Sequence, residues 1–97
     1  MPDKGWPWKR ITADTVILNG PGLFAGVVLA ADGVGTADCT VYDGADSGGR
    51  QFGTFRTPVS RSESHGLPGP ARFDAGIFVA VGSNVEEVIV LYKARTD

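Results

Sequence analysis

Turn-forming residues interrupt this chain roughly every ten residues, so each regular element between them must be short. The sequence holds 14 Gly and 6 Pro in 97 residues. No window of about 11 residues has the i, i+3, i+4, i+7 apolar spacing of a helix without a Gly or Pro inside it. We therefore predict an all-β chain, an antiparallel β-sandwich or a small jelly-roll-like barrel of about seven or eight short strands.

Apolar runs and alternating stretches between the turns place the expected strands. The predicted segments are 11–18 (a strand pair with a polar kink), 23–31, 39–44, 51–57, 76–82 and 85–93. A loop or edge strand should fill 58–73, because Pro68 and Pro70 cannot occupy a central strand. The "GSN" tripeptide at 82–84 predicts a hairpin between the last two strands.

Glycines mark two expected bulges. Gly26 interrupts the buried run "LFAGVVLAA" and indicates a bulge or a close backbone approach. The segments joined by "ADSGGR" predict a hairpin, in which Phe52 and Phe55 differ in parity. We expect a bulge at Gly53 to turn both rings inward.

The length predicts one domain, a β-sandwich over residues 11–97, preceded by an N-terminal arm over residues 1–10. Pro7 favours an extended backbone around it, so Trp6 and Trp8 should point the same way. Two interpretations stay open. Both indoles cover the domain's own core, or the arm docks on a neighbouring subunit or a larger scaffold.

Charge and cysteine content restrict the partners. Nine Lys and Arg against eleven Asp and Glu give a net charge of −2, too weak to predict a nucleic-acid or membrane partner. Cys39 is the single cysteine, so we expect folding in a reducing compartment, without an internal disulfide. The first ten residues contain no apolar run, and we expect no secretion signal.

The sequence predicts no catalytic, cofactor-binding or metal-binding residue, and we expect the chain not to be an enzyme. The "ADSGG" motif around Ser47 resembles the serine motif of trypsin-like proteases, but the only histidine, His65, follows the serine instead of preceding it. We interpret His65 as a surface-loop residue. One alternative is a calcium site formed by four acidic residues of the central segment, namely Asp32, Asp38, Asp43 and Asp46.

The order of strands and turns resembles a known group of proteins. "NGPG" leads into a "GVVL" strand, "VYDG" starts a hairpin, and "FDAGIFVAVG" precedes "VEEVIVLYK". Over about residues 12 to 93 the chain resembles small β-sandwich virion structural proteins of tailed bacteriophages and prophages. The resemblance implies a homo-oligomeric structural role in the virion, which is assembled in the host cytoplasm.

The last strand is apolar on both faces, with Ile89 and Leu91 opposite Val88 and Val90. A strand with one solvent-exposed face should alternate with polar residues, so something should cover the second face. The cover is either another subunit or the chain's own loops or N-terminal arm. The candidate partner-binding residues are Trp6, Trp8, Lys9, Arg10, Val88, Val90 and Tyr92.

These observations lead to a functional expectation. We expect a capsid decoration (cement) protein that binds the head lattice, with the major capsid protein as its partner. The alternatives are a tail or head–tail joining component and a carbohydrate- or receptor-binding β-sandwich module.

Overall fold

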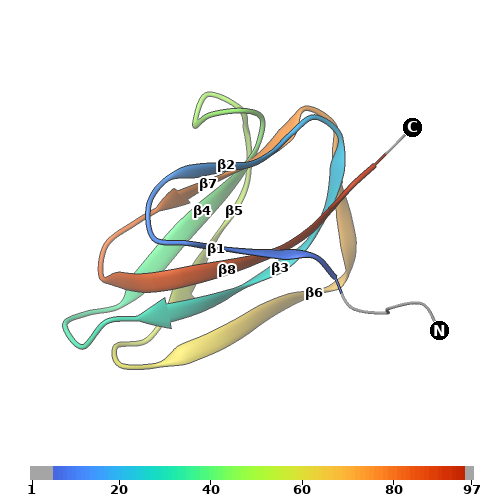
Figure 1. Cartoon of the computed structure of the whole chain (residues 1–97). Helices are drawn as coiled ribbons and strands as arrows, with labels where there is room; N and C mark the ends of the chain where they lie inside the picture. The colour runs from blue at the N-terminus through green and yellow to red at the C-terminus, as the bar shows by residue number, and fades with distance from the viewer. Residues whose placement is uncertain (1–5, 96–97) are drawn as a thin grey trace.

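A computed structural model describes residues 6–95 of the chain and contains two antiparallel four-stranded sheets packed face to face (Figure 1). Sheet A has the strand order β1-β8-β3-β6, and sheet B has the order β2-β7-β4-β5. The predicted antiparallel sandwich is confirmed. The strands are β1 (Trp8–Ile11), β2 (Thr15–Asn19), β3 (Gly22–Ala31), β4 (Ala37–Asp43), β5 (Arg50–Thr57), β6 (Ser62–Phe73), β7 (Gly76–Val81) and β8 (Val85–Ala94).

The core lies between the sheets and is made of alternate residues of the long strands. Because side chains alternate across a strand, one parity of each strand faces the other sheet. The fully buried large side chains include Phe24, Val27 and Leu29 on β3, with Val88 and Val90 opposite on β8. Sheet B contributes further buried residues: Cys39, Val41, Ile77 and Val79.

The predicted bulge at Gly26 is confirmed. The register on both neighbours of β3 shifts between Phe24 and Gly26, and Gly26 has φ +136°, a conformation that only glycine adopts readily. On β6 the same shift leaves the segment 67–70 opposite a single residue of β3. The two prolines of β6 lie in this segment, which has no register partners on β3, and β6 is an edge strand, as the sequence predicts.

The β4–β5 hairpin and its bulge are also confirmed, but Phe52, whose ring was expected inside, is 42% exposed. Val41 pairs with Gly53 and Tyr42 with Gln51, so Phe52 is the extra residue. Its ring packs on Phe73 at a centroid distance of 5.2 Å.

The predicted hairpin between the last two strands is wrong. β7 pairs with β2 and β4 in sheet B, whereas β8 pairs with β1 and β3 in sheet A. The "GSN" turn carries the chain from one sheet to the other. Asn84 adopts a left-handed φ of +59°, and its carbonyl accepts a hydrogen bond from the Asp32 N–H at the end of β3. Each strand thereby enters the interior of a different sheet.

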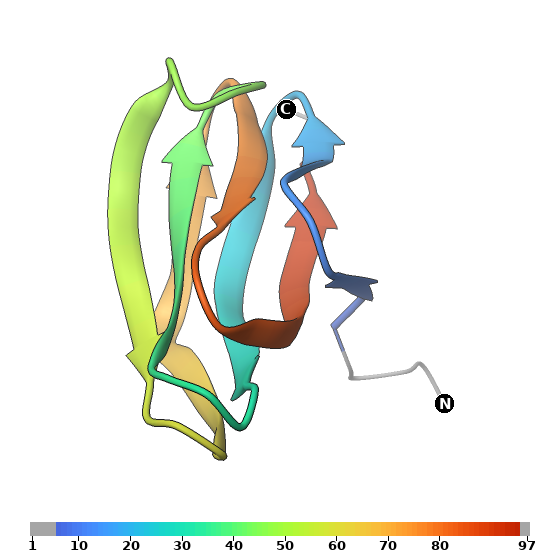
Figure 2. The same ribbon diagram turned by 90° about the vertical axis from the view of Figure 1, so that its left-hand side faces the viewer.

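Part of the expected N-terminal arm over residues 1–10 is a strand of the sandwich instead. Residues 1–5 lie outside the described part of the chain, and Trp8–Ile11 forms β1, which pairs with β8 at the edge of sheet A. Figure 2 shows β1 and β2 on one side of the sandwich and β5 on the opposite side. Residues 8–10 therefore belong to the sandwich. The expected strand pair with a polar kink in 11–18 is β1 and β2, which belong to different sheets.

Candidate functional site

Both tryptophans lie on the outer face of sheet A. Trp8 pairs with Leu91, and Tyr92 N–H donates to the Pro7 carbonyl, which places Trp6 beside Lys93. Because directly opposite residues share a face, the indoles point away from the core. Trp8 is 64% exposed. We call this surface the tryptophan face and define it by Trp6, Trp8, Val28, Ile89 and Leu91.

Charged groups border the tryptophan face. The Lys93 ammonium lies 5.8 Å from the Trp6 ring centroid, within the range of a cation–π contact. Arg10 Nε donates to Glu87 Oε1 at 2.6 Å across the β1–β8 pair. Lys9 is exposed on the edge strand opposite Val90. Of the two basic residues expected to contact a partner, Arg10 therefore has its charge balanced within the chain.

Three residues of β8 expected to bind a partner instead face the interior. Val88 and Val90 are fully buried in the core, and Tyr92, on the same face, packs partly buried against it. A partner of the folded chain cannot reach the two valines, so that interpretation is wrong for them. Their neighbours Ile89 and Leu91 are half-buried on the outer face. The strand therefore does have an apolar outer face, but Ile89 and Leu91 form it instead of Val88 and Val90.

The outer face of sheet B carries a second, smaller apolar group. Tyr42 and Phe78 are cross-strand neighbours with ring centroids 6.1 Å apart, and Val16 pairs with Phe78 on its other side. Both rings are half-buried, and Val16 is exposed. Next to them, the hydroxyls of Thr40 and Thr54 share a hydrogen bond of 3.0 Å.

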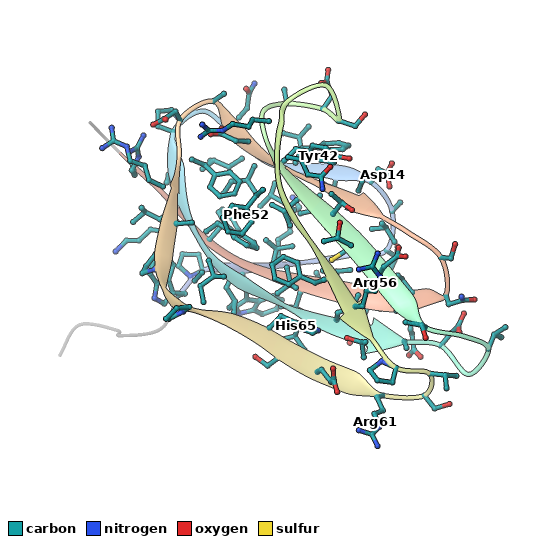
Figure 3. The ribbon with its side chains drawn as sticks, turned by 180° about the vertical axis from the view of Figure 1, so that it is seen from behind. Asp14, Tyr42, Phe52, Arg56, Arg61 and His65 are labelled. Atoms are coloured by element: carbon teal, nitrogen blue, oxygen red, sulfur yellow. The ribbon has the colours of Figure 1, made fainter. Side chains whose placement is uncertain are left out.

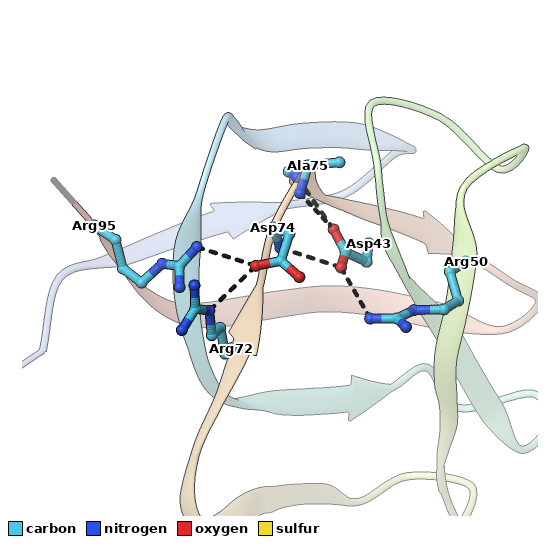
Figure 4. A network of polar contacts seen from close by, with 7 residues as sticks. Asp43, Arg50, Arg72, Asp74, Ala75 and Arg95 are labelled. Atoms are coloured by element: carbon cyan, nitrogen blue, oxygen red, sulfur yellow. Dashed lines mark hydrogen bonds and ion pairs between the residues drawn. The ribbon is translucent and has the colours of Figure 1, made fainter. Parts of the chain in front are cut away.

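Asp43, at the end of β4, holds the turn between β6 and β7 (Figure 4). Its carboxylate accepts backbone N–H bonds from Ala75 at 2.8 Å, Asp74 at 3.1 Å and Gly76 at 3.3 Å. Burial opposes ionisation of the carboxyl group. The three N–H donors, with the Arg50 guanidinium, outweigh burial and hold the pKa of Asp43 below its usual value. The sequence places Asp43 in a hairpin but does not reveal this long-range contact.

His65 is not in a loop. It lies on β6, and its Nε2 shares a hydrogen bond of 2.9 Å with the Thr57 hydroxyl on β5. Thr57 is fully buried, and the His65 ring also packs on Phe55 at 5.6 Å. This hydrogen bond joins the edge strands of the two sheets. Ser47, the serine of the "ADSGG" motif, lies in the β4–β5 turn, where Asp46 Oδ1 accepts from Gly48 N–H.

The four acidic residues of the alternative calcium site have separate structural contacts. Asp32 Oδ1 accepts from Val34 and Gly35 N–H at 2.8 and 3.3 Å, and Asp46 stays within its own turn. Asp38 lies opposite Arg56 on the neighbouring strand. Within residues 6–95, no three His, Cys, Asp or Glu side chains are placed to hold a metal ion.

Comparisons with known proteins do not assign this chain to a family. Residues 6–95 contain no helix that is long and apolar enough to cross a membrane. No protein-family model, curated protein or solved structure matches this chain.

Proposed function

We propose that this chain is a non-enzymatic structural protein of a tailed-phage virion that docks on the head lattice through its tryptophan face. In this proposal it is a capsid decoration protein, located in the virion, with the major capsid protein as partner. The resemblance of its turn and strand pattern to phage virion proteins supports the virion assignment. The single observation that carries the docking role is the exposed indole of Trp8 on an apolar sheet face.

The indole is a suitable anchor for a protein partner. Trp8 lies on the edge strand β1. On the opposite face of this strand, Ile11 is 5% exposed and packs into the core. The position of Trp8 is therefore preorganised, and binding needs little ordering of the chain. Burying the exposed part, about 150 Å² of ring surface, would contribute roughly 4 kcal/mol before association costs. That is the scale of an interface hot spot.

The neighbouring residues extend the anchor into a patch. Val28, Ile89 and Leu91 are half-buried, so a partner must remove further apolar surface from water to cover them. Lys93 and the Arg10–Glu87 pair form a polar margin, an arrangement typical of protein interfaces. We further propose that copies associate with each other on the particle through the outer face of sheet B, which docking of the tryptophan face leaves open.

Quantitative mass spectrometry of phage particles released by the strain that encodes this chain tests the virion assignment. We expect the chain in purified particles at a stoichiometry of many copies per particle. Its absence from intact, purified particles would refute the virion assignment. A few copies per particle would favour a tail or head–tail joining component over decoration.

Co-sedimentation of added chain with particles that lack it tests the docking face. Trp8→Ser should weaken particle binding by about 30-fold or more, the equivalent of a hot-spot loss of 2 kcal/mol. The matched control is Val34→Ser, because Val34 is an exposed apolar residue in the β3–β4 turn, outside the tryptophan face. Equal losses in both variants would contradict docking through this face.

One observation favours a second candidate, a carbohydrate- or receptor-binding module. The Tyr42–Phe78 ring pair presents aromatic surface on the outer face of sheet B, next to the hydroxyls of Thr40 and Thr54. Aromatic faces flanked by hydroxyls suit sugar rings. A glycan array with full-length chain and Tyr42→Ala tests it. Signals that disappear in Tyr42→Ala would support this candidate, and an array without signals would refute it.

A further inference from the structure

A small pocket opens where the edge strands of the two sheets come together, between the start of β5 and the end of β6. Its volume is about 160 Å³, and its lining consists of Asp43, Arg50, Gln51, Phe52, Arg72 and Phe73. Figure 3 shows Phe52 in the space between the two strands. The bulge in β5 places it there, because Phe52 is the residue left unpaired. The pocket lies at the opposite edge of the sandwich from β1 and the tryptophan face.

The back of the pocket is aromatic. Phe73 is 1% exposed and forms part of the core, whereas the Phe52 ring, which packs against it, is 42% exposed. The Phe52 ring also makes an edge-on contact with Phe24 at 5.6 Å, which fixes its orientation. The pocket therefore offers a flat apolar surface in a fixed position, with one side open to solvent.

The mouth of the pocket carries guanidinium groups from both sheets. Arg50 comes from β5 in sheet B, and Arg72 from β6 in sheet A. Arg50 has one long contact, at 3.4 Å, with Asp43 Oδ2, and its side chain is 78% exposed. A guanidinium has five N–H donors, so Arg50 keeps donors for an external acceptor. Arg72 Nε lies 3.2 Å from Asp74 Oδ1 in an exposed pair, which water screens strongly (Figure 4).

The carboxylate of Asp43 limits the charge of a ligand. It is held in the wall by three backbone N–H donors and remains ionised. Two guanidinium groups and one carboxylate give the lining a charge of about +1, which suits a monoanion better than a doubly charged phosphate.

We propose that this pocket binds a small carboxylate carried on a six-membered ring. The carboxylate lies between Arg50 and Arg72, where the exposed Arg50 guanidinium can bind it in bidentate fashion and the positive charge of Arg72 attracts it. The ring lies against Phe52. The size is appropriate, since a protein cavity of about 150 Å³ holds a benzene ring. Two sources share this chemistry, a free aromatic acid and an acidic sugar.

Titration of the full-length chain with benzoate and with glucuronate, followed by ¹H–¹⁵N NMR, tests the proposal. We expect saturable shifts at Gln51, Phe52 and the arginine Nε–H groups, with a Kd in the millimolar range. Benzamide, the neutral counterpart of benzoate, should bind at least fivefold more weakly. Binding of benzoate alone assigns the pocket to aromatic acids, and binding of glucuronate alone assigns it to acidic sugars. Either result supports the proposal.

Matched arginine variants identify the binding groups. Arg50→Gln and Arg72→Gln should each raise the Kd by about fivefold or more, because each removes a charged donor at a solvent-exposed site. Arg56→Gln is the control, because Arg56 lies on β5 opposite Asp38, away from the pocket lining. It should leave the Kd within twofold. All three side chains are exposed, so the fold should be retained.

Three results would overturn the proposal. The first is the lack of a saturable shift with either acid up to about 10 mM. The second is equal binding of benzamide and benzoate. The third is a Kd that neither Arg50→Gln nor Arg72→Gln changes relative to Arg56→Gln.

Discussion

Replacing Asp43 by alanine should cost this domain a large share of its stability, although the residue lies outside the apolar core. Its carboxylate is the acceptor for three backbone N–H groups of the β6–β7 turn. That turn connects sheet A to sheet B, because β6 and β7 belong to different sheets. The substitution therefore leaves the donors of an inter-sheet connection without their acceptor.

The size of the effect follows from the contacts. A hydrogen bond to a charged group contributes roughly 1.5–3 kcal/mol when buried. The Asp43 side chain is only 9% exposed, but water can reach the turn that it holds and replace part of the lost bonds. We therefore expect a total loss of about 2 kcal/mol, well below the sum of three buried bonds. For a domain of this size, that loss lowers the Tm by roughly 8–16 °C.

Urea unfolding followed by circular dichroism measures this loss, and Asp46→Ala is the matched control. Asp46 lies in the adjacent hairpin turn, and its carboxylate accepts one N–H bond, from Gly48, within that turn. It should cost less than about 1 kcal/mol. A free energy of unfolding for Asp43→Ala within 0.5 kcal/mol of that of the parent chain, a margin of about the experimental error, would contradict this expectation. Equal losses of stability in both variants would contradict it too.

The same site predicts a pH dependence. Because the pKa of Asp43 is lower in the folded chain than in the unfolded chain, its ionised form stabilises the fold. This contribution is complete above the unfolded pKa of about 4 and is lost as the pH falls through the lower folded pKa. The parent chain should therefore lose its advantage over Asp43→Asn on acidification from pH 5 to pH 2. A constant difference over that range would contradict the assignment.

Three further predictions test the packing. Val90→Ala should cost about 2–3 kcal/mol in urea unfolding, and Leu91→Ala on the outer face only about 1 kcal/mol; equal costs would contradict the assigned parity of β8. Burial, reinforced by the charge of Asp38, raises the pKa of Cys39 to about 12. Iodoacetamide at pH 8 should therefore label the folded chain at least about 100-fold more slowly than the urea-unfolded chain. Gly26→Ala should cost about 3 kcal/mol or more in the same unfolding assay, since its φ of +136° disfavours a side chain and a Cβ atom would meet the backbone of β6; a loss below 1 kcal/mol would refute the assigned strain.

Most strand positions could be predicted from the sequence because they depend on local signals. Turn residues and period-2 alternation locate the strands, and Gly26 and the prolines of β6 mark the bulge and the edge by their own backbone restrictions. The parity of Phe52 and Phe55 alone predicts the bulge in β5.

The connection between β7 and β8 could not be predicted in the same way. A short polar turn between two apolar runs fits a hairpin and also fits a crossing between stacked sheets. The outcome depends on which strands pair elsewhere, here β2 and β4 with β7, and β1 and β3 with β8. Those are long-range contacts with no local signature.

The parity of β8 is a similar case. Val88, Val90 and Tyr92 on one face and Ile89 and Leu91 on the other are all apolar, so alternation alone cannot tell which set faces inward. The neighbouring strands decide it: Val90 pairs with Val27, inside the sandwich, and Leu91 pairs with Trp8, outside it. The assignment of Val88 and Val90 to a partner-binding surface failed for this reason. The pocket between Arg50 and Arg72 joins two sheets and has no local sequence signal either.

The docking proposal makes one direct claim, that the tryptophan face is covered on a particle. Hydroxyl-radical footprinting of the chain, free in solution and within purified phage particles, measures this directly. We expect oxidation of Trp8 to fall several-fold on the particle, while oxidation of Phe52, which lies at the opposite edge of the sandwich, changes little. Equal oxidation of Trp8 in both states, or a chain that no particle contains, would contradict the claim.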